Sequence, residues 1–262
     1  PATYDSNGGS QTSLPIADIV PDGYSAALIV SSRALFANIL KNFFQNAFSQ
    51  YGVTASASQT QPEVNYTLSL ASGSTSIGVV ESTYSSGANQ FDTFSGTADA
   101  PWNPNKTPVT VPITGIQVSP QNNNIVISGS MPWTQNWASI ISVPRTEGYA
   151  EEGTVNMTAT VSGSNVGSVD SVQDTVSFTG TPSVSVAFDQ SSIWNKIFGD
   201  GSASDAMGQV IATKAQASLQ QLFTIQLPQV NVFAVSNLLF PAQHLLSFSN
   251  VYVPGDLVIF GN

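Results

Sequence analysis

Residues 25–51 read SAALIVSSRALFANILKNFFQNAFSQY, and this stretch decides the fold that the sequence predicts. Its apolar residues recur every three or four positions, at Leu28, Leu35, Phe36, Ile39, Leu40, Phe43, Phe44, Ala47 and Phe48. This spacing places them on one face of an α-helix, while Asn38, Lys41 and Asn42 fall on the polar face. A helix of this length would run for about 39 Å, so we expect a large apolar surface to cover it.

The chain beyond this helix is predicted to form antiparallel strands. Residues 64–70 (VNYTLSL) alternate apolar and polar side chains, and residues 155–161 and 184–188 repeat the pattern. Alternation with a period of two is typical of strands that have one face in the core and one in water. The run of Gln and Asn at residues 121–124 predicts a turn or loop.

A second helix is expected over residues 203–223, because Met207, Val210 and Ile211 begin a weaker apolar stripe and Pro228 bars its continuation. Two helices that bracket a run of strands predict an α+β fold with antiparallel pairing. The expected organisation is a flexible lead-in over residues 1–20, followed by a single α+β domain over residues 21–262.

The composition limits the classes of partner. Charged residues make up 8 % of the 262 residues, against about 25 % in an average soluble domain. The formal net charge is −10, and six basic residues, spread from Arg33 to Lys214, form no cluster. Nucleic acid is therefore not expected as a partner, because binding phosphates needs clustered Lys and Arg. Polarity comes instead from 37 Ser, 22 Thr, 19 Asn and 18 Gln, more than a third of the chain.

No targeting segment is visible in the sequence. The longest purely apolar run, Ala26 to Val30, is far shorter than the roughly 20 residues that a membrane-spanning helix needs. The first residues also lack the basic and apolar regions of a secretory signal. We therefore expect synthesis in the cytoplasm, with release by a non-classical route as the open alternative.

The sequence offers few groups for catalysis or metal binding. It has no Cys and one His, His244, so the usual zinc site is not expected. Glu151 and Glu152 are adjacent and would point to opposite faces of a strand, so they cannot flank one glycosidic bond. No Gly-x-Ser-x-Gly nucleophile motif is present. The prediction is a protein that is not an enzyme, with no catalytic residues, no metal and no cofactor.

An aromatic-rich helix on a sheet with one dry face is compatible with an enclosed apolar ligand, because binding pockets are mostly apolar. The candidate lining is the apolar helical face of Leu28, Leu35, Phe36, Ile39, Leu40, Phe43 and Phe44. The same residues would equally form a sealed core. One further alternative is a pore-forming or membrane-damaging toxin that uses the amphipathic strands of residues 153–188. The other is a glycan- or protein-binding module, in which Trp102, Trp133 and Trp137 either stack on sugars or anchor the core.

Three segments near the ends of the chain resemble a known family: residues 21–30 (PDGYSAALIV), 232–241 (VFAVSNLLFP) and 252–257 (YVPGDL). They are similar to the TULIP (tubular lipid-binding) superfamily, and most of all to its bacterial branch encoded beside clostridial neurotoxins and insecticidal toxin clusters. The resemblance implies a long helix packed against a strongly curved antiparallel sheet around an apolar tunnel. It also implies a lipid or other hydrophobic small molecule as ligand, no catalytic residues, and toxin-complex proteins or a membrane surface as further partners. In this family pattern, Pro254-Gly255-Asp256 would form a turn into the last strand, and Phe240-Pro241 would end another.

Overall fold

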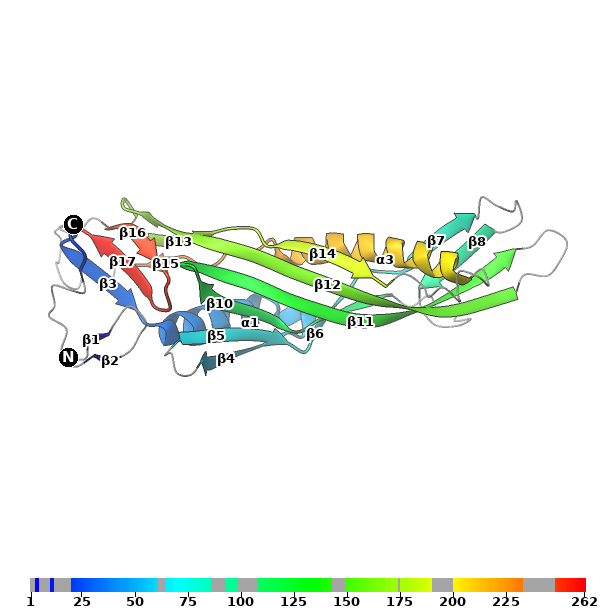
Figure 1. The fold of residues 1–262 in the computed structure, drawn as a ribbon, viewed down its shortest axis with the longest axis horizontal. Helices are drawn as coiled ribbons and strands as arrows, with labels where there is room; N and C mark the ends of the chain where they lie inside the picture. Colours follow the sequence, from blue (N-terminus) through cyan, green and yellow to red (C-terminus); the bar gives the residue numbers. More distant parts are fainter. Residues whose placement is uncertain are drawn as a thin grey trace.

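Two long antiparallel strands form the spine of an elongated molecule (Figure 1). They are β11 (Asn124–Ser142) and β12 (Tyr149–Asp170), and they pair from Ile125 opposite Asn165 to Ile141 opposite Tyr149. This computed structural model describes residues 3–4, 10–11, 20–60, 65–85, 93–98, 108–142, 149–173, 175–189, 200–232 and 248–262. Of the lead-in expected over residues 1–20, all but β1 (Thr3–Tyr4), β2 (Ser10–Gln11) and Val20 lie outside these ranges.

Shorter strands flank the spine end to end and complete a sheet of ten described strands, all antiparallel. Along the first residues of β11 lie, in outward order, β10 (Ile116–Gln121), β5 (Asn65–Ala71) and β4 (Thr54–Thr60). Along its last residues lie β8 (Thr93–Ala98) and, beyond it, β7 (Val80–Ser85). Beside β12 are β14 (Ser183–Phe188), β13 (Thr175–Thr179) and β15 (Val230–Asn231). The predicted antiparallel sheet is therefore confirmed.

Two smaller sheets complete the β-structure of the described chain. One contains β16 (Phe248–Tyr252), β17 (Leu257–Gly261) and β3 (Ala26–Val30), in that order. The other pairs β6 (Gly73–Ser76) with β9 (Thr110–Ile113). Pro254, Gly255 and Asp256 form the bend between β16 and β17, at the place where a turn was expected.

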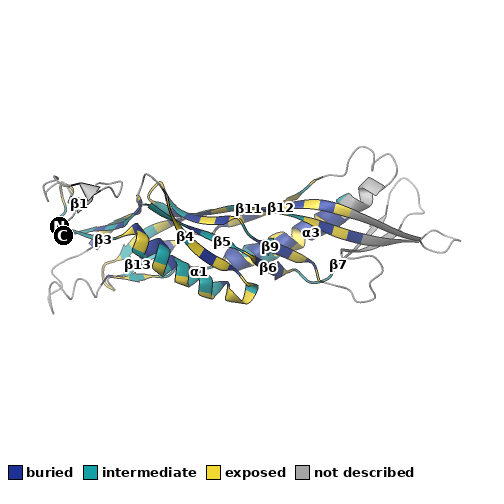
Figure 2. Cartoon of the chain, turned by 90° about the horizontal axis from the view of Figure 1, so that it is seen from below, coloured by how far each residue is buried: buried dark blue, intermediate teal, exposed yellow. Residues whose placement is uncertain are grey.

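The strands of the large sheet have one dry and one wet face (Figure 2). On β12, the buried Val155, Met157, Ala159 and Val161 alternate with exposed Thr154, Asn156, Thr158 and Thr160. The turn between β10 and β11 has positive φ at Asn122 (51°) and Asn123 (62°), a conformation that Asn tolerates better than most residues. The period-two pattern of the sequence thus corresponds to actual strands.

The long amphipathic helix predicted over residues 25–51 is not present, and the α+β fold class built on it is wrong, because the described chain is mostly β. Residues 26–30 are β3, paired with β17. Helical structure begins at Arg33 with η2 (Arg33–Leu40), which is wound as a π-helix, and continues as α1 (Lys41–Ala47) for 15 residues in all. A short 3₁₀ turn, η3 (Ser49–Tyr51), follows.

The change from strand to helix at residues 31–32, between β3 and η2, has a physical cause. Ile29 and Val30 are β-branched and favour a strand over a helix. Asp256, just before β17, accepts a hydrogen bond from the backbone N–H of Ser32, and the Ser32 hydroxyl accepts one from the N–H of Tyr66 (2.8 Å). These bonds tie the chain between β3 and η2 to β5 and to the bend before β17, so the apolar helical periodicity starts only at Leu35.

The helix expected over residues 203–223 is present as α3 (Asp200–Phe223). It lies along β14 and β12. Gly208 allows the close approach, because a Cβ atom there would lie only 2.6 Å from the ring of Phe188.

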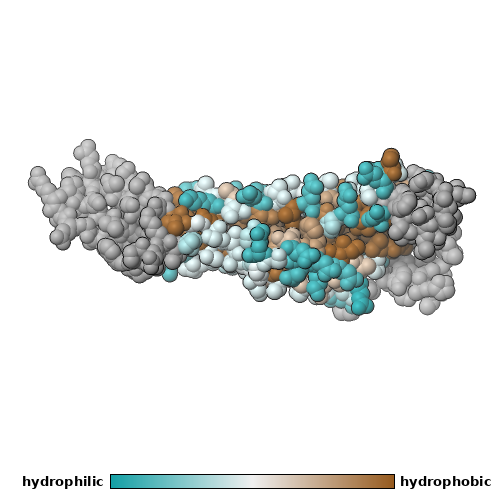
Figure 3. Space-filling view, turned by 180° about the vertical axis from the view of Figure 1, so that it is seen from behind, coloured by the Kyte–Doolittle hydropathy of each residue, from teal (hydrophilic) through white to brown (hydrophobic). Residues whose placement is uncertain are grey.

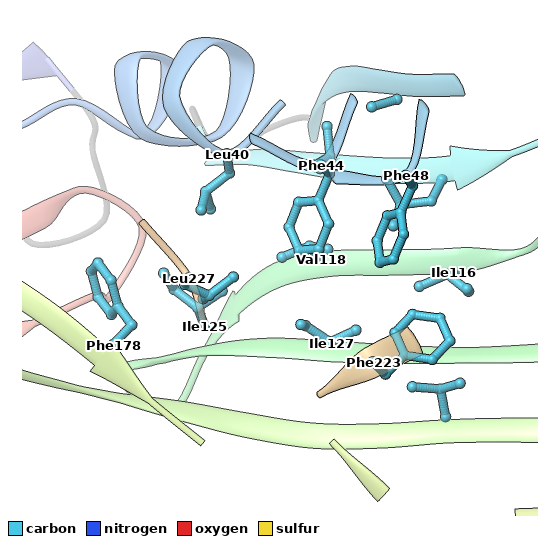
Figure 4. Packing of buried hydrophobic residues seen from close by; sticks show 14 of the residues in the cluster. Leu40, Phe44, Phe48, Ile116, Val118, Ile125, Ile127, Phe178, Phe223 and Leu227 are labelled. Atoms are coloured by element: carbon cyan, nitrogen blue, oxygen red, sulfur yellow. The ribbon is translucent and has the colours of Figure 1, made fainter. Parts of the chain in front are cut away.

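Both helical segments pack into one hydrophobic cluster on the dry face of the sheet (Figure 4). The rings of Phe44 and Phe48 are stacked with centroids 5.8 Å apart. Phe48 meets Phe223, at the end of α3, edge to face at 5.8 Å. The two helices are thus joined through aromatic side chains.

Two glutamines from the helices bind the outer edges of strands. Gln45 of α1 donates to the carbonyl of Val53 (3.1 Å) and accepts from the N–H of Ala55 (2.9 Å), at the start of β4. Gln220 of α3 donates to the carbonyl of Pro182 (2.8 Å) and accepts from the N–H of Val184 (2.9 Å), at the start of β14. In both cases one amide occupies the position of a missing neighbouring strand.

Candidate ligand-binding site

The structure brings most of the predicted lining residues together, but from three elements, β3, η2 and α1. Leu35, Phe36, Leu40 and Phe44 belong to the main hydrophobic cluster, and Phe43 packs against it. Leu28 also packs against the cluster, although it lies on β3 and not on the helix. Ile39 is half-buried and lies outside this set.

The central members of the lining are closely packed. Leu35, Phe36, Leu40 and Phe44 each have 0 % of their surface exposed, so no water molecule contacts them. Val118, Ile125 and Ile127 of β10 and β11 lie opposite the helix in the same cluster (Figure 4). A ligand that contacts these four side chains must therefore displace existing packing.

A pocket of about 400 Å³ opens at one end of this cluster, between the end of β13 and the segment that follows α3. Its walls come from two stretches that are distant in sequence, residues 177–181 and residues 224–229. Gln229 and Ser177 link the two walls through a side-chain hydrogen bond of 3.4 Å. The volume lies within the range of about 300–1,000 Å³ that is usual for small-molecule sites.

The pocket has an apolar floor and an uncharged polar rim. Phe178, Ile225 and Leu227 provide the apolar side chains, and hydroxyl and amide groups come from Ser177, Thr179, Thr181, Thr224, Gln226 and Gln229. None of the described residues that line the pocket is ionisable. Such a site suits a ligand with an apolar body and a neutral polar group. The body would pack against the apolar floor, and the polar group would hydrogen-bond the rim.

The pocket floor is continuous with the predicted lining. Phe178 and Leu227 are buried members of the same cluster as Leu40 and Phe44, and Figure 4 shows both beside Ile125. The sequence did not predict these residues as part of a site, because the pocket forms only where β13 and residues 224–229 meet in the fold. The only local signal was the alternation of Ile225 and Leu227 with polar residues before Pro228.

The tryptophans of β11 face the interior. Trp137 is 2 % exposed, and Trp133 is half-buried against the core. The indole Nε1 atoms of both residues are buried and have no hydrogen-bond partner among the residues that the structure describes. Trp102 lies outside the described residues.

The other groups considered for chemistry are not assembled into a site in the part of the chain that the structure describes. No three His, Cys, Asp or Glu residues there lie close enough together to hold a metal ion. His244 is outside the described ranges, and Glu151 and Glu152 lie on β12. Residues 153–188 span β12, β13 and β14, whose apolar side chains Val155, Val176 and Val184 are buried in the core.

Within the described ranges, no helix combines the length and apolar character that crossing a membrane requires. The chain matches no protein-family model, and no curated protein sequence is significantly similar to it.

Proposed function

We propose that this protein binds a lipid or another apolar ligand without catalysing a reaction, and that the pocket between β13 and residues 224–229 is the entrance. The observation that carries the proposal is the continuity between the pocket floor and the helix-lined core through Phe178 and Leu227. A ligand seated in the pocket would bury its apolar part against these side chains, gaining about 25 cal/mol for each Å² of apolar surface removed from water.

The polar groups of the site set the class of ligand. Hydroxyl and amide groups at the rim would hydrogen-bond a neutral head group, and the described lining residues offer no charged partner to an ionised one. Hydrophobic residues also form a band along the long axis on the face seen in Figure 3, between hydrophilic ones. The resemblance of the chain ends to the TULIP superfamily supports the same ligand class and extends the proposal to an accessory role in a bacterial toxin system.

The test is the binding of a fluorescent fatty acid and a fluorescent phospholipid to the wild-type chain and to a Thr179→Trp variant. Thr179 is exposed on the pocket rim, so an indole there should fill the mouth without disturbing the core. We expect the affinity to fall at least tenfold, equivalent to a loss of about 1.4 kcal/mol.

The matched control is Thr160→Trp, the same substitution at an exposed position on β12 that does not line the pocket. It should bind both probes as the wild type does. Equal binding by the two variants would place any ligand elsewhere, and no uptake by the wild type would refute the proposed function.

A further inference from the structure

The pocket lies where the large sheet loses a strand. β15 pairs with only the first two residues of β13, Thr175 and Val176. β13 continues along β12 to Thr179, but residues 224–229, which precede β15 in the chain, form no strand and line the pocket together with residues 177–181. The pocket therefore opens along the edge of a strand, where backbone groups as well as side chains can meet a ligand.

The hydrogen bonds of β12 determine which residues of β13 direct their backbone groups to this edge. In an antiparallel strand, the N–H and C=O of one residue point to the same side, and those of the next residue point to the other side. β13 and β14 lie on the same side of β12, because both pair with it in one continuous register. The N–H of Asp189, directly after β14, donates to the carbonyl of Asn156 on β12 (2.9 Å). The even-numbered residues of β12 therefore face β13 and β14.

Phe178 is the residue whose backbone faces the pocket. Even-numbered residues of β12 pair with odd-numbered residues of β13, so the N–H and C=O of Phe178 point away from β12. Val176 is oriented in the same way and pairs with Val230 of β15. The next position in that register, opposite Phe178, would be Pro228, which has no N–H to donate. No hydrogen bond joins these two backbone groups of Phe178 to another described residue.

A ligand that satisfies both groups needs a donor and an acceptor at the spacing of a strand residue. An amino-acid unit, in which one carbon joins the N–H and the C=O, presents both in that geometry. Extended peptides use the same pairing when they add a strand to an open sheet edge. An ester only accepts hydrogen bonds, so it would leave the carbonyl of Phe178 without a donor.

We propose that the pocket binds an amphiphile with an acylated amino-acid unit, which pairs with the backbone of Phe178 as a neighbouring strand would. Its acyl chain would lie on the apolar floor of Phe178, Ile225 and Leu227. Its other end must be neutral, since the described lining residues offer no charged partner to a carboxylate. This inference rests on the proposed function and narrows its ligand class to apolar molecules that carry a peptide-like amide.

The experiment compares N-dodecanoylglycine methyl ester with its depsi analogue, in which an oxygen atom replaces the N–H. Both probes keep the carbonyl that would accept from the Phe178 N–H, but only the amide can donate to the Phe178 carbonyl. In NMR titrations of ¹⁵N,¹³C-labelled protein, we expect both probes to shift the Phe178 amide proton downfield. The amide alone should shift the Phe178 carbonyl carbon downfield, and it should bind about five- to tenfold more tightly, the value of one hydrogen bond.

The pocket variants are the controls, and the outcomes separate the two proposals. Thr179→Trp should weaken the binding of both probes, and Thr160→Trp should leave it unchanged. Equal affinities for the two probes, or Phe178 signals that do not move, would overturn this inference and leave the proposed function standing. Failure to bind either probe would also overturn it alone if the protein takes up the fluorescent lipids. Failure to bind any of these molecules would overturn both proposals.

Discussion

Gln45 and Gln220 each present one amide to two backbone groups of an edge strand, a carbonyl and the N–H two residues further on. This is the pattern of groups that a neighbouring strand would satisfy. Unpaired strand edges are templates for aggregation, and natural sheets cover or block them. β4 and β14 each have one strand neighbour among the described strands, so these side chains protect the first residues of both exposed edges.

At the residue scale, we predict that Gln220→Ala lowers the free energy of unfolding by about 1–3 kcal/mol, because it removes two hydrogen bonds and leaves the Val184 N–H without an acceptor. Chemical denaturation measures the change. Gln216→Ala, an exposed position on the same helix, is the control and should change stability by less than about 0.5 kcal/mol. Equal effects of the two substitutions would contradict the role of the amide.

At the element scale, local patterns predicted the strands and α3 but not where helical structure begins. Alternation over residues 155–161 corresponds to β12, and the Asn-rich turn at residues 121–124 joins β10 to β11. Leu28, by contrast, fits a helical spacing with Leu35 by chance. Its strand conformation depends on pairing with β17, more than 200 residues away, which no local pattern reports.

The conformation of residues 26–30 is testable by amide hydrogen exchange. As an edge strand, β3 directs only alternate N–H groups toward β17, so we predict alternating slow and fast exchange along these five residues. From residue 37 onward, through η2 and α1, consecutive amides should all be protected, because each donates within the helix. Uniform protection from residue 26 onward would mean that the helix begins there.

The candidate site was predictable only in part, because it too depends on contacts between segments that are distant in sequence. The buried face of Leu35, Phe36, Leu40 and Phe44 follows from helical periodicity within one segment. The pocket requires β13 and residues 224–229 to meet, about 50 residues apart in sequence, and their individual patterns indicate only a strand and a chain that leaves a helix.

At the scale of the whole molecule, the unusual composition follows from the large sheet. One row of paired residues crosses six strands and is polar and uncharged throughout, with Ser56, Ser69, Gln117, Ser128, Ser162 and Ser183. Hydroxyl and amide groups thus cover the wet face, while the other face is buried against two helical segments. The scarcity of charge is a property of this face and is compatible with a neutral, apolar ligand inside.

The most direct test of the central claim, that this chain is a non-enzymatic binder of apolar molecules, is solvent extraction of detergent-free purified protein followed by mass spectrometry. We predict about one equivalent of a neutral lipid or other amphiphile per chain, reduced in Thr179→Trp and retained in Thr160→Trp. A reproducibly clean extract from wild-type protein that also takes up no added fatty acid or phospholipid would contradict the account.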